Sequence, residues 1–231
     1  MDASEGYVSS IPVEAKTKAT GKYDNGRPTR VEYYLGKEKV GLRIFSRDGD
    51  LEIEYSFRNG QYHGWSYRWD EPAKLLSATP YQDGVEHGTA YQWADDGRLL
   101  GTYRMEHGTG TDLWWEEWDG IVSLAEAFQM QDGLRNGHEW WFHTGKPGQL
   151  WIEKQWFTGK QHGIEREWNS KGRLSRGYPR YWIHDQRVAK RQYVRAAAKD
   201  PTLPPFRAED NVPHRDFPPE IDQHLHGTSR G

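Results

Sequence analysis

The chain has 231 residues, and its 31 Lys and Arg against 34 Asp and Glu give a formal net charge of −3 at pH 7. This balance creates no strongly positive surface field, which argues against a nucleic acid partner. Cysteine is absent, which excludes disulfides, thiolate nucleophiles and sulfur-bound zinc, and neither an apolar run of about 18 residues nor an export signal is found. We therefore expect a cytoplasmic protein with no integral membrane association and no cofactor.

The composition favours short strands and tight turns. The chain contains 12 Trp, 13 Tyr and 25 Gly, although its mean hydropathy is −1.02. Aromatic residues are enriched in strands that are half buried, and glycine is enriched in the turns between them. The composition therefore predicts an all-β fold rather than a thick helical core.

Residues 1–20 are polar, and we expect them to form a flexible N-terminus. A repeat domain follows over residues 21–184. Its glycines come in pairs, typically four residues apart, such as Gly60 with Gly64, and they alternate with single glycines in polar turns, such as Gly97. The second glycines of successive pairs stand 22 to 27 residues apart, at Gly64, Gly88, Gly110, Gly137 and Gly163. This spacing is typical of solenoid repeats.

The residues between the glycines alternate between apolar and polar with period 2. Positions +1, +3 and +5 after the second glycine are mostly apolar or aromatic, and include Tyr67, Trp93, Leu113, Trp140 and Trp168. Period 2 between glycine turns predicts strands. Dipeptides such as Asn59-Gly60 and Asp83-Gly84 adopt the positive φ of tight hairpins. We therefore predict an antiparallel β-meander or solenoid.

The C-terminal sequence predicts a helix followed by a tail. Residues 185–200 include Tyr193 and three alanines before Pro201, which predicts a short helix that caps the last repeat. Residues 201–231 are rich in proline, so we expect an extended, solvated tail. The alternative is that the tail lies along the sheet or docks a partner.

Three histidines stand one residue before a repeat glycine: His63, His87 and His162. Equivalent positions in adjacent repeats are two strands apart, about 10 Å at a strand spacing of about 4.8 Å. A metal ion needs its ligands within about 2.1 Å. We therefore assign these histidines to turns and expect no metal site. Since no nucleophile motif is found, we also expect no catalytic residues.

Aromatic and acidic residues gather on the opposite face of the later repeats, at the +2 and +4 positions. They are Asp112, Trp114, Glu139, Trp141, Glu165 and Glu167. The earlier repeats have Arg43 and Arg68 on this face, so its charge changes from basic to acidic along the chain. Exposed aromatic residues beside charges are typical of interfaces. This pattern predicts a basic protein partner anchored by Trp114 and Trp141. The alternative is that the sheet curls over these rings or that the helix covers them.

Two blocks of the repeat resemble a known family. Residues 59–64 (Asn-Gly-Gln-Tyr-His-Gly) with Trp69, and residues 158–163 (Thr-Gly-Lys-Gln-His-Gly) with Trp168, resemble the MORN-variant repeat of the YwqK-type family. The resemblance covers residues 21–198. Members of that family are commonly labelled antitoxin or immunity components of bacterial toxin systems, and other MORN repeats bind proteins or lie against membranes.

The resemblance therefore implies a non-catalytic module that binds a partner protein, such as a basic toxin. It assigns no catalytic residues. Two alternatives remain open: a scaffold or membrane-apposing repeat protein and, more remotely, an enzyme.

Overall fold

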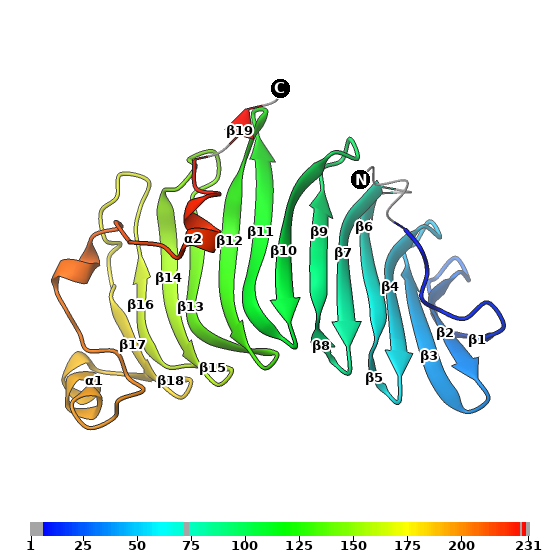
Figure 1. The fold of residues 1–231 in the computed structure, drawn as a ribbon, viewed down its shortest axis with the longest axis horizontal. Helices are drawn as coiled ribbons and strands as arrows, with labels where there is room; N and C mark the ends of the chain where they lie inside the picture. Colours follow the sequence, from blue (N-terminus) through cyan, green and yellow to red (C-terminus); the bar gives the residue numbers. More distant parts are fainter. Residues whose placement is uncertain (1–6, 72–73, 227, 230–231) are drawn as a thin grey trace. The chain divides into compact units, whose positions relative to one another are not determined.

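A computed structural model describes residues 7–71, 74–226 and 228–229. The chain divides into two compact units, Met1–Gly108 and Thr109–Gly231. Each unit is built from antiparallel strands that follow one another in chain order (Figure 1). The antiparallel β-meander predicted from the period-2 pattern is confirmed.

The first unit contains ten strands in its described part. They are β1 (Lys16–Lys22), β2 (Pro28–Leu35), β3 (Glu38–Phe45), β4 (Leu51–Arg58), β5 (Gln61–Tyr62), β6 (Gly64–Glu71), β7 (Lys74–Gln82), β8 (Val85–Glu86), β9 (Gly88–Trp93) and β10 (Leu99–Glu106). The short strands β5 and β8 pair with β4 and β7, the same neighbours as β6 and β9. They extend β6 and β9 beyond a break at His63 and His87.

The second unit repeats this arrangement and adds the helices. Its strands are β11 (Thr109–Trp118), β12 (Ile121–Gln131), β13 (Leu134–Phe142), β14 (Leu150–Phe157), β15 (Lys160–Gln161), β16 (Gly163–Glu167), β17 (Arg180–Ile183), β18 (Gln186–Val188) and β19 (Thr228–Ser229). Its helices are α1 (Lys190–Ala197), a 3-10 turn (Glu209–Asn211) and α2 (Pro219–Asp222). Strand β19 pairs with the start of β12.

The predicted turn chemistry is confirmed at the hairpin ends. Asn59, Asp83 and Asp132 have φ angles of 52°, 50° and 51°, and each is followed by a glycine with positive φ. Two successive residues with positive φ form the tight turn whose twist matches that of paired strands.

The residue before the second glycine of a pair connects one hairpin to the next. Its side chain accepts a hydrogen bond from the backbone N–H of the first turn residue in the following hairpin, and we call this contact the hairpin link. The acceptor and donor residues are His63 and Asp83 (3.4 Å), His87 and His107 (3.1 Å), Thr109 and Asp132 (3.1 Å), Asn136 and Thr158 (3.0 Å), and His162 and His184 (3.2 Å). The three histidines, which were assigned to turns, lie instead in the breaks between a short and a long strand, and their side chains bind the turn of the next hairpin.

The face formed by positions +1, +3 and +5 contains the core, as predicted. Tyr67, Trp93 and Trp168 are at most 1% exposed. In the first unit, Tyr67 packs with Leu75, Ala78 and Trp93. We call this side of each unit its core face.

The predicted flexible segment 1–20 differs from the structure in the part that is described. Residues 1–6 lie outside the described residues. Ile11 is 7% exposed, and β1 begins at Lys16. Segment 7–11 lies on the core face because the carboxylate of Glu54, which is fully buried, accepts hydrogen bonds from the hydroxyls of Tyr7 (2.8 Å) and Ser9 (2.7 Å).

The predicted helix at 185–200 is present, but it is shorter. Strand β18 precedes it, so the β-structure extends past residue 184. Tyr193 of α1 is fully buried and packs against Tyr181 of β17, with ring centroids 5.2 Å apart. The helix therefore covers the last strands on the core face.

The tail lies along the second unit, which is the alternative to a solvated tail. In Figure 1 it crosses in front of β14 and β13 as an orange-to-red segment that leads into α2. Leu203, Ile221 and Leu225 are 2%, 0% and 7% exposed. Phe217 packs against Trp140 at 5.5 Å between ring centroids. These apolar contacts explain why a proline-rich segment is ordered on the core face.

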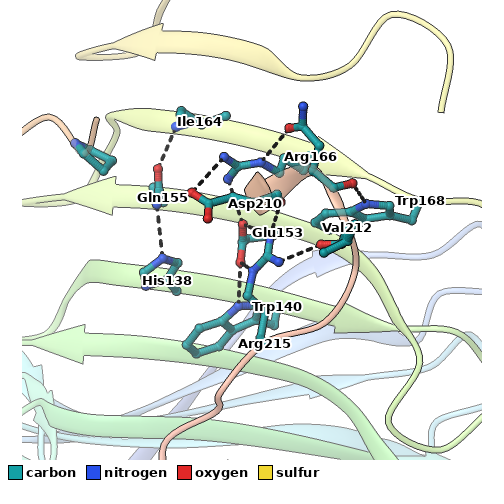
Figure 2. Close-up of polar contacts among 12 residues, drawn as sticks. His138, Trp140, Glu153, Gln155, Ile164, Arg166, Trp168, Asp210, Val212 and Arg215 are labelled. Carbon is teal, nitrogen blue, oxygen red and sulfur yellow. Dashed lines mark hydrogen bonds and ion pairs between the residues drawn. The ribbon is translucent and has the colours of Figure 1, made fainter. Parts of the chain in front are cut away.

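A buried ionic cluster holds the tail at its centre (Figure 2). Glu153 of β14 is 2% exposed, and it accepts hydrogen bonds from Arg166 of β16 at 3.0 Å and from Arg215 of the tail at 2.7 and 2.9 Å. Trp140 Nε1 also donates to Glu153, at 3.2 Å. Nearby, Trp168 Nε1 donates to the carbonyl oxygen of the tail residue Asn211 at 2.7 Å.

Candidate protein-binding site

The strand registers place all six predicted site residues on one face of the second unit. Trp114 of β11 pairs with Glu126 of β12, which pairs with Trp141 of β13. Directly paired residues point to the same side of a sheet. We call this side the outer face of the second unit, and it is opposite the core face. Its members include Asp112, Trp114, Glu126, Phe128, Glu139, Trp141, Lys154, Trp156, Glu165, Glu167, Arg180 and Trp182.

The two predicted tryptophan anchors are half-buried on this face. Trp141 packs edge-on against Trp151, with ring centroids 6.0 Å apart. Trp114 is also intermediate in exposure. In the residues that the structure describes, α1 and the tail pack on the core face, so neither covers these rings. The strands themselves therefore bury part of each ring.

The charge predicted for this face needs a correction, because its acidic residues are largely neutralised from within the chain. Glu139 is 1% exposed and forms ion pairs with Arg135 at 2.7 Å and Lys154 at 2.8 Å. Glu165 is 7% exposed, accepts a hydrogen bond from Trp182 Nε1 at 2.7 Å and lies 3.8 Å from Arg180. The predicted acidic surface is thus a mixed surface in which buried acids are paired.

The basic side chains on this face also lie over aromatic rings. The guanidinium of Arg135 is 4.5 Å from the ring centroid of Phe128 and 5.1 Å from that of Trp156. Lys154 Nζ is 5.0 Å from the ring of Trp141. These distances are within the cation–π range of about 6 Å. The face therefore combines cations, rings and carboxylates over neighbouring strands.

A bulge in β12 determines the side on which Glu126 lies. Regular alternation along this strand would give Leu124 and Glu126 the same face. Instead, the register shifts by one residue at Ala125, because Trp114 pairs with Glu126 while Trp115 pairs with Leu124. A β-bulge of this kind reverses the side to which the following residues point. The bulge moves Glu126 to the outer face.

The environment of Glu126 opposes its ionisation. Burial raises the pKa of its carboxyl above the ordinary value, and the nearby charges of Glu139 and Asp112 raise it further, while Arg135 and Lys154 act in the opposite direction. In the described ranges Glu126 has no hydrogen bond from a side chain and no ion pair within 4 Å. A cation placed next to Glu126 would relieve this unfavourable environment.

The buried carboxylate on the core face has a different environment. Burial by itself raises the pKa of Glu153, but the hydrogen bonds and charge of Arg215, with the charges of His138 and Arg166, bring the pKa below its ordinary value. Glu153 is therefore held as an anion inside the cluster that binds the tail. Four hydrogen bonds from Trp140, Arg166 and Arg215 satisfy this buried carboxylate, which is typical of a structural ion pair.

No group of three His, Asp or Glu side chains that could hold a metal ion is found among the residues that the structure describes. Within the same residues, no helix is long and apolar enough to cross a membrane.

No protein-family model matches the chain, and no curated protein sequence matches it significantly. The resemblance to MORN-variant repeats therefore depends on the repeated residues alone.

Proposed function

We propose that the chain is a non-catalytic protein-binding module of the MORN-variant type, and that it acts as an antitoxin or immunity-like protein. The observation that supports this proposal is the outer face of the second unit. There, half-buried tryptophans lie beside carboxylates on a face that the chain's own tail and helix leave open. Rings with adjacent charges at the centre of a surface are typical of binding hot spots.

The partner that fits this face best is a protein with basic side chains. Although Glu139 and Glu165 are paired within the chain, Glu126 lies between the two tryptophans and forms no ion pair among the described residues. Complementary charge increases association rate and specificity. A toxin that binds phosphate groups would present such basic side chains.

The test is a pull-down from the native host with the wild type and the double variant Trp114→Ala, Trp141→Ala. Each truncation is expected to cost about 2 kcal/mol of binding free energy if the ring is central. The matched control is Phe157→Ala, because Phe157 is 37% exposed on β14 and alternates with Glu153, on the side opposite the two tryptophans. We expect one partner to be recovered by the wild type and by the control but not by the folded double variant. Equal recovery by all three proteins would exclude this face.

A further inference from the structure

Three neighbouring strands place an acid between two tryptophans on the outer face. Trp114, Glu126 and Trp141 occupy directly paired positions on β11, β12 and β13. Two strand spacings separate the tryptophan backbones by about 10 Å. Glu126 lies between them on the same side of the sheet. A cation bound to its carboxylate would therefore lie between the two tryptophan side chains.

The same face contains a second group of aromatic rings with an acid, and the chain fills it with its own arginine. Phe128 of β12 pairs directly with Glu139 of β13, whose partner on β14 is Lys154, and Trp156 lies two residues further along β14. Arg135 places its guanidinium 4.5 Å from the Phe128 ring and 5.1 Å from the Trp156 ring. Its Nη1 is 2.7 Å from Glu139. The two aromatic rings and the acid therefore form a complete arginine site within this protein.

The row around Glu126 differs in one respect. Over the residues that are described, no hydrogen bond or ion pair joins a cation of the chain directly to Glu126. Lys154 contacts Trp141 from β14, whereas Glu126 is on β12, on the other side of strand β13. Burial together with the charges of Glu139 and Asp112 raises the pKa of Glu126, which is the environment that a bound cation would stabilise.

We propose that Trp114, Glu126 and Trp141 form the seat for an arginine side chain of the partner protein. This proposal rests on the proposed function, since it names the group by which the partner is recognised. Arginine fits better than lysine because its guanidinium is planar and weakly hydrated, stacks on aromatic faces and donates two parallel hydrogen bonds to one carboxylate. Arg135 in the neighbouring set shows this chemistry on the same face.

The test is a titration of the full chain with N-acetyl-arginine amide, observed through the indole N–H signals of the tryptophans by NMR. Signals are assigned with single Trp→Phe variants. We expect saturable shifts that are largest for Trp114 and Trp141. The citrulline analogue has nearly the same shape but no charge, and the lysine analogue has charge but no planar group. We expect both to bind about tenfold more weakly or worse, since hydrogen bonds to charged groups contribute that much.

The variant Glu126→Gln keeps the shape of the site and removes its charge. We expect it to weaken arginine binding about tenfold, whereas Trp118→Leu should leave binding unchanged. The indole spectrum also reports whether each variant is folded, and Trp114→Leu takes the place of Glu126→Gln if that variant unfolds. Three results would overturn the proposal. They are indole shifts as large with the citrulline analogue as with the arginine analogue, shifts spread over all tryptophans, and unchanged arginine binding in the folded Glu126→Gln or Trp114→Leu variant.

This titration needs no partner, so its result is independent of the pull-down. If the double tryptophan variant loses the partner in the pull-down but the arginine probe does not bind the wild type, the arginine seat is overturned and the binding face is retained. Arginine binding without any partner in the pull-down would support the seat and count against the antitoxin-like function.

Discussion

Replacement of Arg215 by alanine tests whether the buried carboxylate of Glu153 holds the tail on the core face. Arg215 donates to both oxygens of Glu153, at 2.7 and 2.9 Å, from a position 62 residues away in the chain. The substitution removes both contacts. Arg166 at 3.0 Å and Trp140 at 3.2 Å remain as partners of the carboxylate.

The expected loss follows from the burial of this pair. Removing one partner of a buried ion pair costs about 3–5 kcal/mol. Glu153 keeps Arg166, and the Arg215 side chain is 17% exposed, so the loss should be smaller. We expect the free energy of unfolding to fall by about 2–3 kcal/mol, comparable to the loss of hydrogen bonds to a charged group. For a chain of this length the Tm should fall by about 4–12 °C.

The assay is urea unfolding followed by tryptophan fluorescence, with two controls. Arg47→Ala removes an exposed pair, in which Arg47 and Asp24 are 2.6 Å apart and both more than half exposed, and it should cost less than about 1 kcal/mol. In a Glu153→Gln background, Arg215→Ala should cost clearly less than in the wild type. An effect of Arg215→Ala no larger than that of Arg47→Ala would refute the role assigned to this cluster.

Two further predictions concern the hairpins. Burial and the neighbouring His184 lower the pKa of His162, so the folded state resists its protonation. The free energy of unfolding should therefore fall as pH decreases below the ordinary histidine pKa of about 6.5. Urea midpoints between pH 7.5 and 5 in the wild type and in His162→Asn measure this effect, and an equal pH dependence in both proteins would contradict it. Gly163→Ala should lower the free energy of unfolding by about 1–3 kcal/mol more than Gly26→Ala does. Both glycines have positive φ, but an added Cβ at Gly163 would lie 2.6 Å from Gln155, whereas a Cβ at Gly26 would meet no atom within 4 Å. Equal changes in Tm for the two variants would show that the contact with Gln155 has no effect.

The strand pattern could be predicted because it depends on near neighbours in the chain. Tyr67 and Trp93 occupy the core face that alternation assigns to them, and Asn59 adopts the turn conformation that its side chain tolerates. Both depend on the local geometry of a strand or a turn. A single bulge at Ala125 was enough to move Glu126 to the other face. An inserted residue reverses the side to which all following residues of the strand point, and the alternating pattern does not show where such a residue is inserted.

The position of the tail and the charge balance of the site could not be predicted in the same way. Ile221 and Leu225 are isolated apolar residues in a polar, proline-rich segment, and their burial depends on strands distant in sequence. Arg135 and Lys154 neutralise Glu139 from its own strand and from the next one, so a charge count at the +2 and +4 positions alone does not include them. Contacts of this kind are set by packing between elements rather than by local preference.

The hairpin links also define how this chain could gain or lose repeats during evolution. Histidine, threonine and asparagine all serve as the acceptor before the glycine, so that position requires one lone pair at a fixed place rather than one residue type. A duplicated repeat that keeps any such acceptor can therefore receive the next hairpin without redesign of its neighbours. A valine at this position has the size of threonine but no lone pair, so it would leave the backbone N–H of the following turn without its acceptor. Copy number can thus change in whole repeats when each new junction keeps this acceptor together with the backbone hydrogen bond beside it, such as Gly84 N–H to the carbonyl oxygen of Tyr62.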